Sequence, residues 1–179
     1  MKIVEKKLLF DVKVRKDQEA FGRLYDLYVE KIYRFVFFKI QNKEETEDIT
    51  SDIFLKAWTY LLENPSREVH SFSGLVYRIA RNAVVDYYRS KVKNKEQALE
   101  TAEALGEIDI RYANFEIDQE MEKVLAHLKR LKQEYQEVLM LRYVEDLEIS
   151  EIAEIINKSK TNVRVILFRA IRKLKEIMK

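Results

Sequence analysis

The end of the chain carries the residues best suited to bind a nucleic acid, because it is rich in cations and nearly free of acids. Between positions 158 and 179, eight residues are basic: Lys158, Lys160, Arg164, Arg169, Arg172, Lys173, Lys175 and Lys179. Glu176 is the only acid in this stretch. Such a local excess of positive charge favours a polyanionic partner. Arg164 and Asn162 could each make a pair of hydrogen bonds to a base edge, to guanine and adenine respectively.

These residues need a helix to present them, and the sequence predicts two short helices joined by a tight turn. The first helix has apolar residues at helical spacing, namely Ile149, Ile152, Ala153 and Ile156. Asn157 tolerates the left-handed conformation that ends a helix, and Ser159 suits the N-cap of the next one. The second helix is expected to turn four residues inward: Val163, Ile166, Leu167 and Ala170. A helix-turn-helix with a polar, basic second helix is typical of a recognition helix in the major groove.

Seven residues of the second helix are expected to bind DNA: Lys160, Thr161, Asn162, Arg164, Arg169, Arg172 and Lys173. Its first turns should meet base edges, whereas the last three of these residues should reach phosphates. Two short amphipathic helices joined by a tight turn also occur in proteins that bind no DNA. A purely structural role for this segment therefore stays open at this point.

The composition indicates a globular, all-helical protein. The 179 residues suffice for one ordinary domain or two small ones, and 47% are hydrophobic and 36% charged. With only three glycines and one proline, the sequence offers few of the residues that favour turns. The absence of cysteine excludes disulfides and thiolate zinc sites. No signal-peptide core and no apolar run of about 20 residues occurs, so we expect a cytoplasmic protein without membrane insertion.

The net charge of +2 conceals alternating blocks of charge. Positions 43–52 hold five acids against one lysine, positions 78–95 hold six cations against one acid, and positions 96–122 hold nine acids against one arginine. Such blocks suggest separate surfaces for separate partners.

The hydrophobic pattern predicts two small helical domains joined by an acidic linker. Residues 1–91 should form the first domain, with helices near 17–39, 44–62 and 71–91. The Asn64-Pro65-Ser66 segment marks a loop between the second and third helices.

Residues 92–114 are polar and acidic and are expected to be the linker, so the second domain should span 115–179 and end in the helix-turn-helix. Two apolar stripes should precede that motif: Met121, Val124, Leu125, Leu128 and Leu131, then Tyr135, Val138, Leu139 and Tyr143.

Several ordered motifs resemble one family, the bacterial sigma factors. Thr46–Trp58 and Ser71–Asn82, the latter followed by Asp86 and Arg89, resemble the second region of that family. Leu128–Ala170 resembles the fourth region. The compact two-domain layout is similar to the extracytoplasmic-function (ECF) group, and the resemblance covers about positions 18–91 and 120–177.

The resemblance implies a protein that binds core RNA polymerase through its β′ and β subunits, recognises the −10 and −35 elements of promoter DNA and promotes transcription initiation. The helix that carries Asp48 and Asp52 is similar to the surface that binds the β′ subunit. These two acids lie one turn apart on one helix face and could pair with arginines of a partner. Most of the neighbouring apolar residues are more simply interpreted as core: Ile49, Ile53, Phe54 and Trp58. An anti-sigma factor is a common partner in this group, but no residue pattern in the chain indicates one.

The third predicted helix resembles the reader of the −10 element. Its cations, amide and aromatic rings could hold unpaired bases by stacking and polar contacts: Arg78, Arg81, Asn82, Tyr87, Tyr88 and Arg89. In the family, the loop before this helix receives a flipped base, which here implies part of 64–73. For Tyr87 and Tyr88, ordinary packing at a domain edge is an equal alternative. Asp86 is expected to orient a neighbouring arginine.

The chain departs from the family at several positions. Leu75, Lys132 and Asn157 stand where Trp, Pro and Gly are frequent, and none of these changes should break the fold. Asn162, Val165 and Ile166 stand where many members have Thr, Ser and Arg. The base preference of the family therefore does not carry over.

Catalysis is not expected, and neither is a metal or a cofactor. The two histidines lie far apart without metal-ligand spacing, and no phosphate loop or nucleophile motif occurs. One alternative is a stand-alone helix-turn-helix regulator that binds promoter duplex without polymerase. Another is a helical adaptor or antagonist that binds only proteins. The acidic helix before the arginine-rich one argues against the first, and the basic end of the chain argues against the second.

Overall fold

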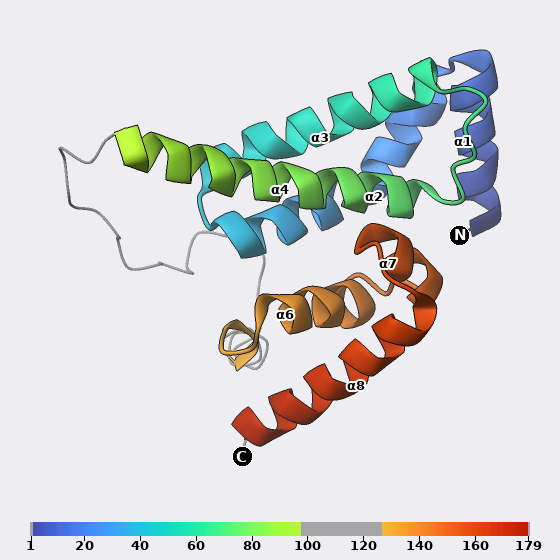
Figure 1. Ribbon diagram of the computed structural model, residues 1–179. Helices are drawn as coiled ribbons and strands as arrows, with labels where there is room; N and C mark the ends of the chain where they lie inside the picture. Colours follow the sequence, from blue (N-terminus) through green and yellow to red (C-terminus); the bar gives the residue numbers. More distant parts are fainter. Residues whose placement is uncertain (1, 98–126, 179) are drawn as a thin grey trace. The chain divides into compact units, whose positions relative to one another are not determined.

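The structure is a computed structural model, and it describes residues 2–97 and 127–178. These residues form helices and connecting segments, with no strand among them, so the all-helical prediction is confirmed (Figure 1). The helices are α1 (Lys2–Arg15), α2 (Gln18–Ile40), α3 (Lys43–Glu63), α4 (Phe72–Gln97), α6 (Gln133–Leu139), the π-helix η2 (Met140–Val144), α7 (Ile149–Ile155) and α8 (Lys160–Ile177). The chain divides into two compact units, Met1–Ala113 and Asn114–Lys179. None of the helices in the described segments is long and apolar enough to span a bilayer.

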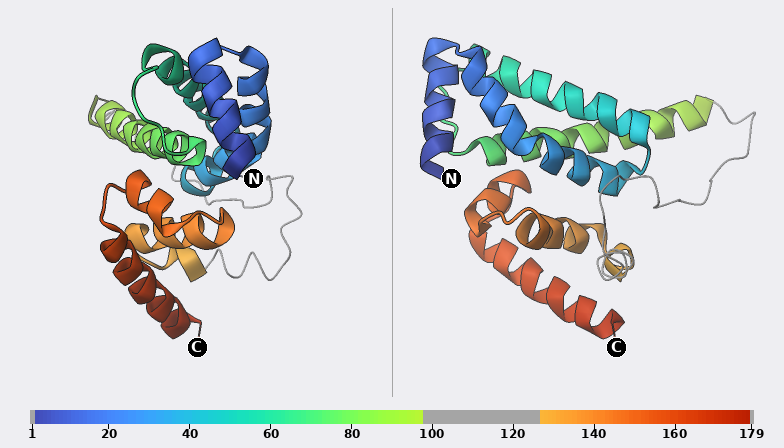
Figure 2. Two further views of the ribbon diagram at one scale, coloured as in Figure 1. Left: turned by 90° about the vertical axis from the view of Figure 1, so that its right-hand side faces the viewer. Right: turned by 180° about the vertical axis from the view of Figure 1, so that it is seen from behind.

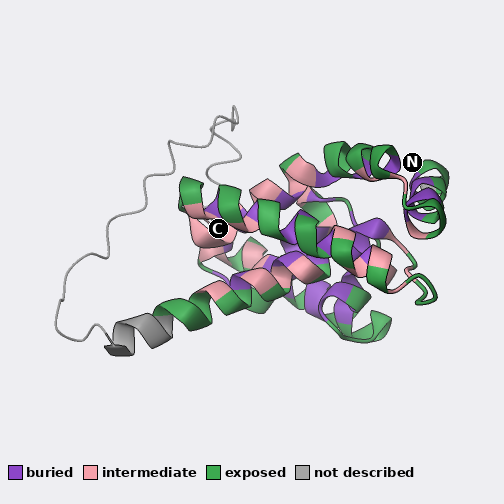
Figure 3. Cartoon of the chain, turned by 90° about the horizontal axis from the view of Figure 1, so that it is seen from above, coloured by how far each residue is buried: buried purple, intermediate pink, exposed green. Residues whose placement is uncertain are grey.

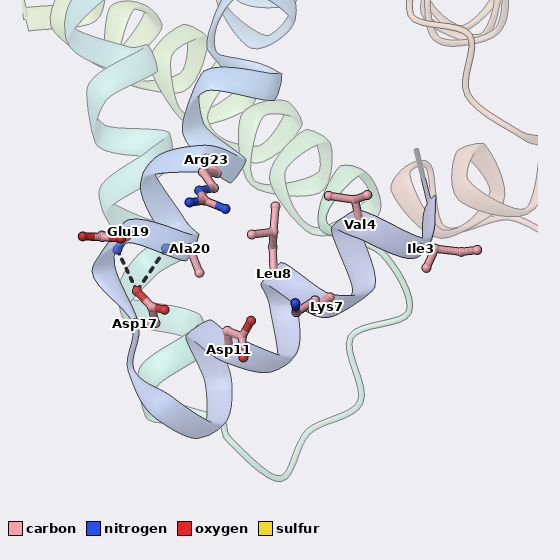
Figure 4. A pocket seen from close by; sticks show the side chains of 9 residues that line it. All are labelled: Ile3, Val4, Lys7, Leu8, Asp11, Asp17, Glu19, Ala20 and Arg23. Carbon is pink, nitrogen blue, oxygen red and sulfur yellow. Dashed lines mark hydrogen bonds between the residues drawn. The ribbon is translucent and has the colours of Figure 1, made fainter.

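Side-chain caps set the starts of α2 and α3. The carboxylate of Asp17 accepts hydrogen bonds from the amides of Glu19 and Ala20 at 2.9 and 3.1 Å (Figure 4). The side chain of Asn42 accepts one from the amide of Glu45 at 3.0 Å. These caps satisfy amides that have no partner inside the helix. Both helices therefore begin where the sequence predicted them.

In the first unit, the helices α1 to α4 pack against one another (Figure 2). Aromatic and aliphatic residues form its core. Helical spacing predicts seven residues on the inner face of α2, and the structure buries five of them: Leu24, Tyr28, Ile32, Phe35 and Val36. Phe21 is half-buried and Tyr25 is 39% exposed. The ring of Phe35 meets that of Tyr77 at 5.4 Å, edge to face. Tyr28 meets Phe72 at 5.3 Å in the same manner. These ring pairs join α2 to α4 and give the helix with the −10 candidates a rigid support.

The sequence prediction ended the third helix too early. α4 continues to Gln97 rather than ending at Lys91, so the expected linker begins inside a helix. Residues 92–97 contain no Gly or Pro and include Lys, Glu and Gln, which are good helix formers. The last turn whose burial is described, 88–91, is exposed (Figure 3). The expected linker residues 98–114 lie outside the described residues.

The helix α1 was not predicted at all. It buries only part of its apolar residues, Leu8, Leu9 and Val12 among them. Others remain exposed around it: Ile3, Val4, Phe10 and Val14. Apolar residues on every side leave no clean stripe, and the sequence pattern therefore did not indicate a helix.

The second unit confirms the predicted helix-turn-helix. Asn157 has the left-handed conformation, with φ of 53°. The hydroxyl of Ser159 accepts a hydrogen bond from the amide of Asn162 at 3.2 Å and caps α8. The four residues expected to face inward from α8 are all buried: Val163, Ile166, Leu167 and Ala170.

One residue of the predicted apolar stripes was placed wrongly. Tyr143 is 63% exposed, whereas Val138 and Leu139 are buried as expected. Tyr143 belongs to η2, whose wider π-helical turn changes the direction of successive side chains relative to an α-helix. Leu128 and Leu131 of the other stripe are buried. Met121, Val124 and Leu125 lie outside the described residues.

Candidate nucleic-acid interface

The exposed side of α8 presents mixed apolar and basic chemistry. Directly opposite the buried side lies a row at helical spacing, made of Thr161, Val165, Phe168 and Arg172. Phe168 is 70% exposed and Val165 is 41% exposed. The other expected DNA ligands of this helix are also exposed: Lys160, Asn162, Arg164, Arg169 and Lys173. Phe168 is a further candidate contact that the sequence analysis missed. Helical spacing could have found it, since it lies one turn beyond Arg164.

Ion pairs near α8 lie within its last turns and in the turn that precedes it. Near the C-terminal end, Lys173 Nζ lies 3.0 Å and Arg172 Nε 3.5 Å from the carboxylate of Glu176. The hydrogen bond from Lys173, followed by the charges of both cations, lowers the pKa of that carboxyl. Before the helix, Lys158 pairs with Glu134 of α6 at 3.3 Å. This exposed pair joins the turn to α6, although surface ion pairs contribute little stability.

On α4, the first half of the predicted −10 set lies next to the α3–α4 loop. Arg78 and Asn82 are exposed, and Arg81 is half-buried. The guanidinium of Arg78 lies 6.0 Å from the ring centre of Tyr60. Arg67 of the loop lies 5.9 Å from the same ring. The structure thus brings two cations to one aromatic ring at the edge of this loop.

Arg67 and Tyr60 were missed as individual candidates. Arg67 is the only Lys or Arg between positions 64 and 71, so its charge was the available signal. Tyr60 lies in the last turns of α3, and only the fold brings it to Arg78.

The second half of the −10 set is tied to neighbouring helices. The Tyr87 hydroxyl donates to Glu45, and Lys91 Nζ lies 3.1 Å from the same carboxylate. The Tyr88 hydroxyl donates to the carbonyl of Lys39, near the end of α2. Burial raises the pKa of Tyr88, and burial with the hydrogen bond to Glu45 raises that of Tyr87. Both hydroxyls are therefore used inside the protein, whereas the side chain of Tyr88 remains 43% exposed.

Arg89, the remaining candidate of this helix, has a local acidic partner. Its guanidinium lies 3.4 Å from the carboxylate of Asp86, and both side chains are largely exposed. This pairing agrees with the expected role of Asp86 beside a neighbouring arginine.

The acidic face of α3 carries the candidate contacts for a protein partner. Asp48 and Asp52 are both exposed, one turn apart. Leu55 follows on the same side and is 63% exposed, which makes it an apolar neighbour that the sequence interpretation missed. Ile53 and Phe54 are buried, so their interpretation as core is confirmed, whereas Ile49 and Trp58 are only half-buried. An exposed leucine beside two carboxylates is the combination that a mixed apolar and cationic partner surface would contact.

Within residues 2–97 and 127–178, no three His, Cys, Asp or Glu side chains lie together as metal ligands would. His70 instead pairs with Glu68 in the α3–α4 loop at 3.2 Å.

Comparisons with known proteins match both halves of the chain. A family model described as Sigma-70 region 2 matches residues 24–94. A second model, Sigma-70 region 4, matches residues 121–174. The two matches therefore contain the α4 and α8 surfaces described above, while α1 precedes the first match.

Individual relatives are similar over most of the chain. The ECF RNA polymerase sigma factor SigM of Bacillus subtilis is 28% identical over 86% of this chain and 92% of SigM. SigW of the same organism is 28% identical over 88% of this chain and 87% of its own length. BldN of Streptomyces coelicolor is also 28% identical, over 90% of this chain, but the chain spans only 61% of BldN.

Solved structures share the helical fold. The structure of CnrH in complex with the cytosolic domain of CnrY has a TM-score of 0.70 and 21% identity, covering 98% of this chain and 97% of CnrH. The sigma factor RpoE from Bartonella quintana, in complex with the anti-sigma factor NepR, has a TM-score of 0.64 and 16% identity, covering 89% of this chain and 97% of RpoE.

Proposed function

Since the chain belongs to the extracytoplasmic-function group of the sigma-70 family, we propose that it binds core RNA polymerase, recognises −10 and −35 promoter elements and promotes transcription initiation. It acts where polymerase and DNA are, in the cytoplasm, and supplies no catalysis of its own. The observation that carries this proposal is the order of the two family matches, each of which contains an exposed face of suitable chemistry.

The second unit is assigned to the −35 element. Ser159 caps α8 with its first turns exposed, so Lys160, Asn162 and Arg164 can approach base edges. The apolar side chains of Val165 and Phe168 add surface for contact with thymine methyl groups. Three cations further along the helix are assigned to phosphates: Arg169, Arg172 and Lys173.

The first unit is assigned to the −10 element and to polymerase. Arg78, Arg81 and Asn82 lie on the part of α4 that follows the α3–α4 loop, where unpaired bases would be received. The hydroxyls of Tyr87 and Tyr88 already have partners inside the protein, so only their rings are assigned to the DNA, as stacking surface. The α3 face with the exposed Asp48 and Asp52 is assigned to the β′ subunit.

An anti-sigma factor is a further partner that we propose. The support is that RpoE, which shares this fold, is bound to one in its solved structure. The described residues of this chain do not themselves select such a partner.

Transcription started by purified protein and core polymerase tests the proposal. A library of templates with randomised −35 and −10 segments is incubated with core polymerase, with and without the chain, and the transcripts are sequenced. We expect start sites that share two elements at a fixed separation, present only when the chain is added. No transcripts above core polymerase alone would contradict the proposal.

The same experiment separates the alternatives. A stand-alone regulator would enrich duplexes in a binding selection without polymerase and would start no transcription. A protein-only adaptor would bind core polymerase and enrich no DNA at all.

A further inference from the structure

The helix α1 is joined to the start of α4, directly after the α3–α4 loop, by a buried carboxylate. Glu5 is 7% exposed. One of its oxygens accepts a hydrogen bond from the backbone amide of Phe72 at 2.7 Å, and the other accepts one from the Tyr28 hydroxyl at 2.7 Å. Glu5 thus connects α1 with α2 and with the first residue of α4. Figures 1 and 2 show the loop before α4 running beside α1.

A second contact holds the middle of the loop. Lys13, near the end of α1, donates from Nζ to the backbone carbonyl of Arg67 at 2.6 Å. The amide of Arg67 donates to the Asn64 carbonyl at 3.2 Å and closes a turn. The guanidinium of Arg67 lies over Tyr60. Arg67 is therefore held through its amide, its carbonyl and its side chain.

The contact with Glu5 is strong for physical reasons. A buried carboxylate is stable only when its oxygens accept hydrogen bonds, and both oxygens of Glu5 do so. The first amides of a helix lack partners within the helix and attract negative charge. Glu5 satisfies the amide of Phe72, while the hydroxyl of Ser71 accepts from the amide of Gly74 at 3.0 Å. The position of the start of α4 therefore depends on α1.

We propose that α1 is a positioning element for −10 recognition, in which Glu5 and Lys13 hold the α3–α4 loop in the conformation that receives an unpaired base. This inference rests on the proposed function. Glu5 and Lys13 touch no DNA in it, and they act through the backbone of Phe72 and Arg67. A preorganised loop discriminates between bases because its polar groups stay in place, whereas a loosened loop accepts several bases with similar affinity.

Four single variants of the full chain test the proposal. Glu5→Leu removes both hydrogen bonds, and Lys13→Met removes the contact with Arg67 while keeping most of the side chain. Glu5→Gln retains an oxygen acceptor for the Phe72 amide and is the conservative rescue. Val12→Ala is the matched control, because Val12 is fully buried in α1 and makes neither loop contact. All variants are compared at a temperature at which melting curves show them folded.

Amide hydrogen exchange measures the loop contact without polymerase. We expect Glu5→Leu to accelerate exchange at Phe72 and in residues 64–71 by about tenfold relative to Val12→Ala, because a hydrogen bond to a charged acceptor is lost. Lys13→Met should accelerate exchange within 64–71, and Glu5→Gln should stay near wild type. If Val12→Ala accelerates loop exchange as much as Glu5→Leu, α1 only stabilises the unit and the proposal is overturned.

Transcription from premelted templates then measures base discrimination. Each −10 position of the unpaired strand is given each of the four bases in turn. Glu5→Leu and Lys13→Met should reduce the ratio between the best and the worst base at one position by about five- to tenfold, the lower end of what a single base contact contributes. Val12→Ala and Glu5→Gln should preserve the ratio. An unchanged ratio at every position would overturn the positioning role even if loop exchange rises.

The two experiments also separate this proposal from the one it rests on. If the wild-type chain starts no transcription with core polymerase, the proposed function fails and the −10 role fails with it. The exchange measurement would still decide whether α1 holds the loop. If the wild type transcribes and discriminates but the variants match it, the sigma-factor function stands and only the role of α1 is lost.

Discussion

At the scale of single residues, Thr50 of α3 contrasts with its helical neighbour Thr46. Both are buried, but Thr46 donates to the Asn42 carbonyl at 2.6 Å, whereas the hydroxyl of Thr50 has no hydrogen-bond partner among the described residues. A buried polar group without a partner destabilises a fold, and removing the hydroxyl relieves that cost.

Thr50→Val should therefore stabilise the first unit by about 1 kcal/mol, which for a small domain raises Tm by about 4–8 °C. Thr46→Val is the control and should lower Tm, because it deletes a hydroxyl that is hydrogen-bonded. Thermal unfolding followed by circular dichroism measures both. A lower Tm for Thr50→Val would show that its hydroxyl has a partner in solution.

Arg164 and Arg172 illustrate how position on α8 determines a residue's effect. Arg164 lies one turn after the capped start of the helix, whereas Arg172 lies further along and pairs with Glu176. Arg164→Ala should cost about 1–3 kcal/mol of DNA binding, with a preference relaxed at one base pair. Arg172→Ala should weaken all sequences about equally. The comparison uses binding of holoenzyme to a panel of single-base −35 variants, and a uniform loss for both residues would contradict the placement of α8 in the groove.

At the scale of elements, α3 presents different chemistry to the core and to solvent. Ile53 and Phe54 are buried, while Asp48, Asp52 and Leu55 are exposed. Substitutions on the exposed side can therefore abolish a partner contact without damaging the core.

Changing both Asp48 and Asp52 to Lys should weaken association with core polymerase by about tenfold or more, because charge-assisted pairs become repulsive. Helix content and Tm should change little, since both side chains are exposed. Glu30 and Asp26 are exposed acids of α2, and their double change to Lys provides a control with the same change in net charge. Equal affinity of core polymerase for the Asp48, Asp52 variant and the wild type would exclude this face as the contact.

At the scale of the whole molecule, the local distribution of charge matters more than the net charge of +2. Replacing the three phosphate candidates of α8, Arg169, Arg172 and Lys173, by Ala changes the net charge to −1. Replacing the exposed Lys6, Lys7 and Arg15 of α1 by Ala changes it equally.

Only the α8 variant should alter the salt dependence of promoter binding. Three lost phosphate contacts reduce the slope of log affinity against log salt by about 2.7, which makes the variant's deficit about fortyfold smaller at 200 mM than at 50 mM salt. Holoenzyme binding to a duplex promoter, titrated at several salt concentrations, gives both slopes. An equal change for the α1 variant would mean that net charge, not contact, sets the slope.

The sequence alone determined the elements whose causes are local. The stop at Asn157, the cap at Ser159 and the inner face of α8 all follow from residues within a few positions of one another. The same holds for the starts of α2 and α3, each set by a capping side chain two or three residues away. Helical spacing also separated the buried Ile53 and Phe54 from the exposed Asp48 and Asp52, because the helix face of a residue depends only on its position in the helix.

Only the tertiary structure decided the features that depend on distant residues. Glu5 and Phe72 are 67 positions apart, Lys13 and Arg67 are 54 apart, and Tyr88 and Lys39 are 49 apart. No periodicity connects such pairs, because they meet only when the packing of four helices brings them together. The exposure of Tyr143 likewise depends on the π-helical turn of η2, and the residue types of 140–144 do not predict a π-helix. The sequence thus indicated which residues could bind DNA. The packing of the helices decided which of these side chains bond to other parts of the protein and which are exposed to solvent.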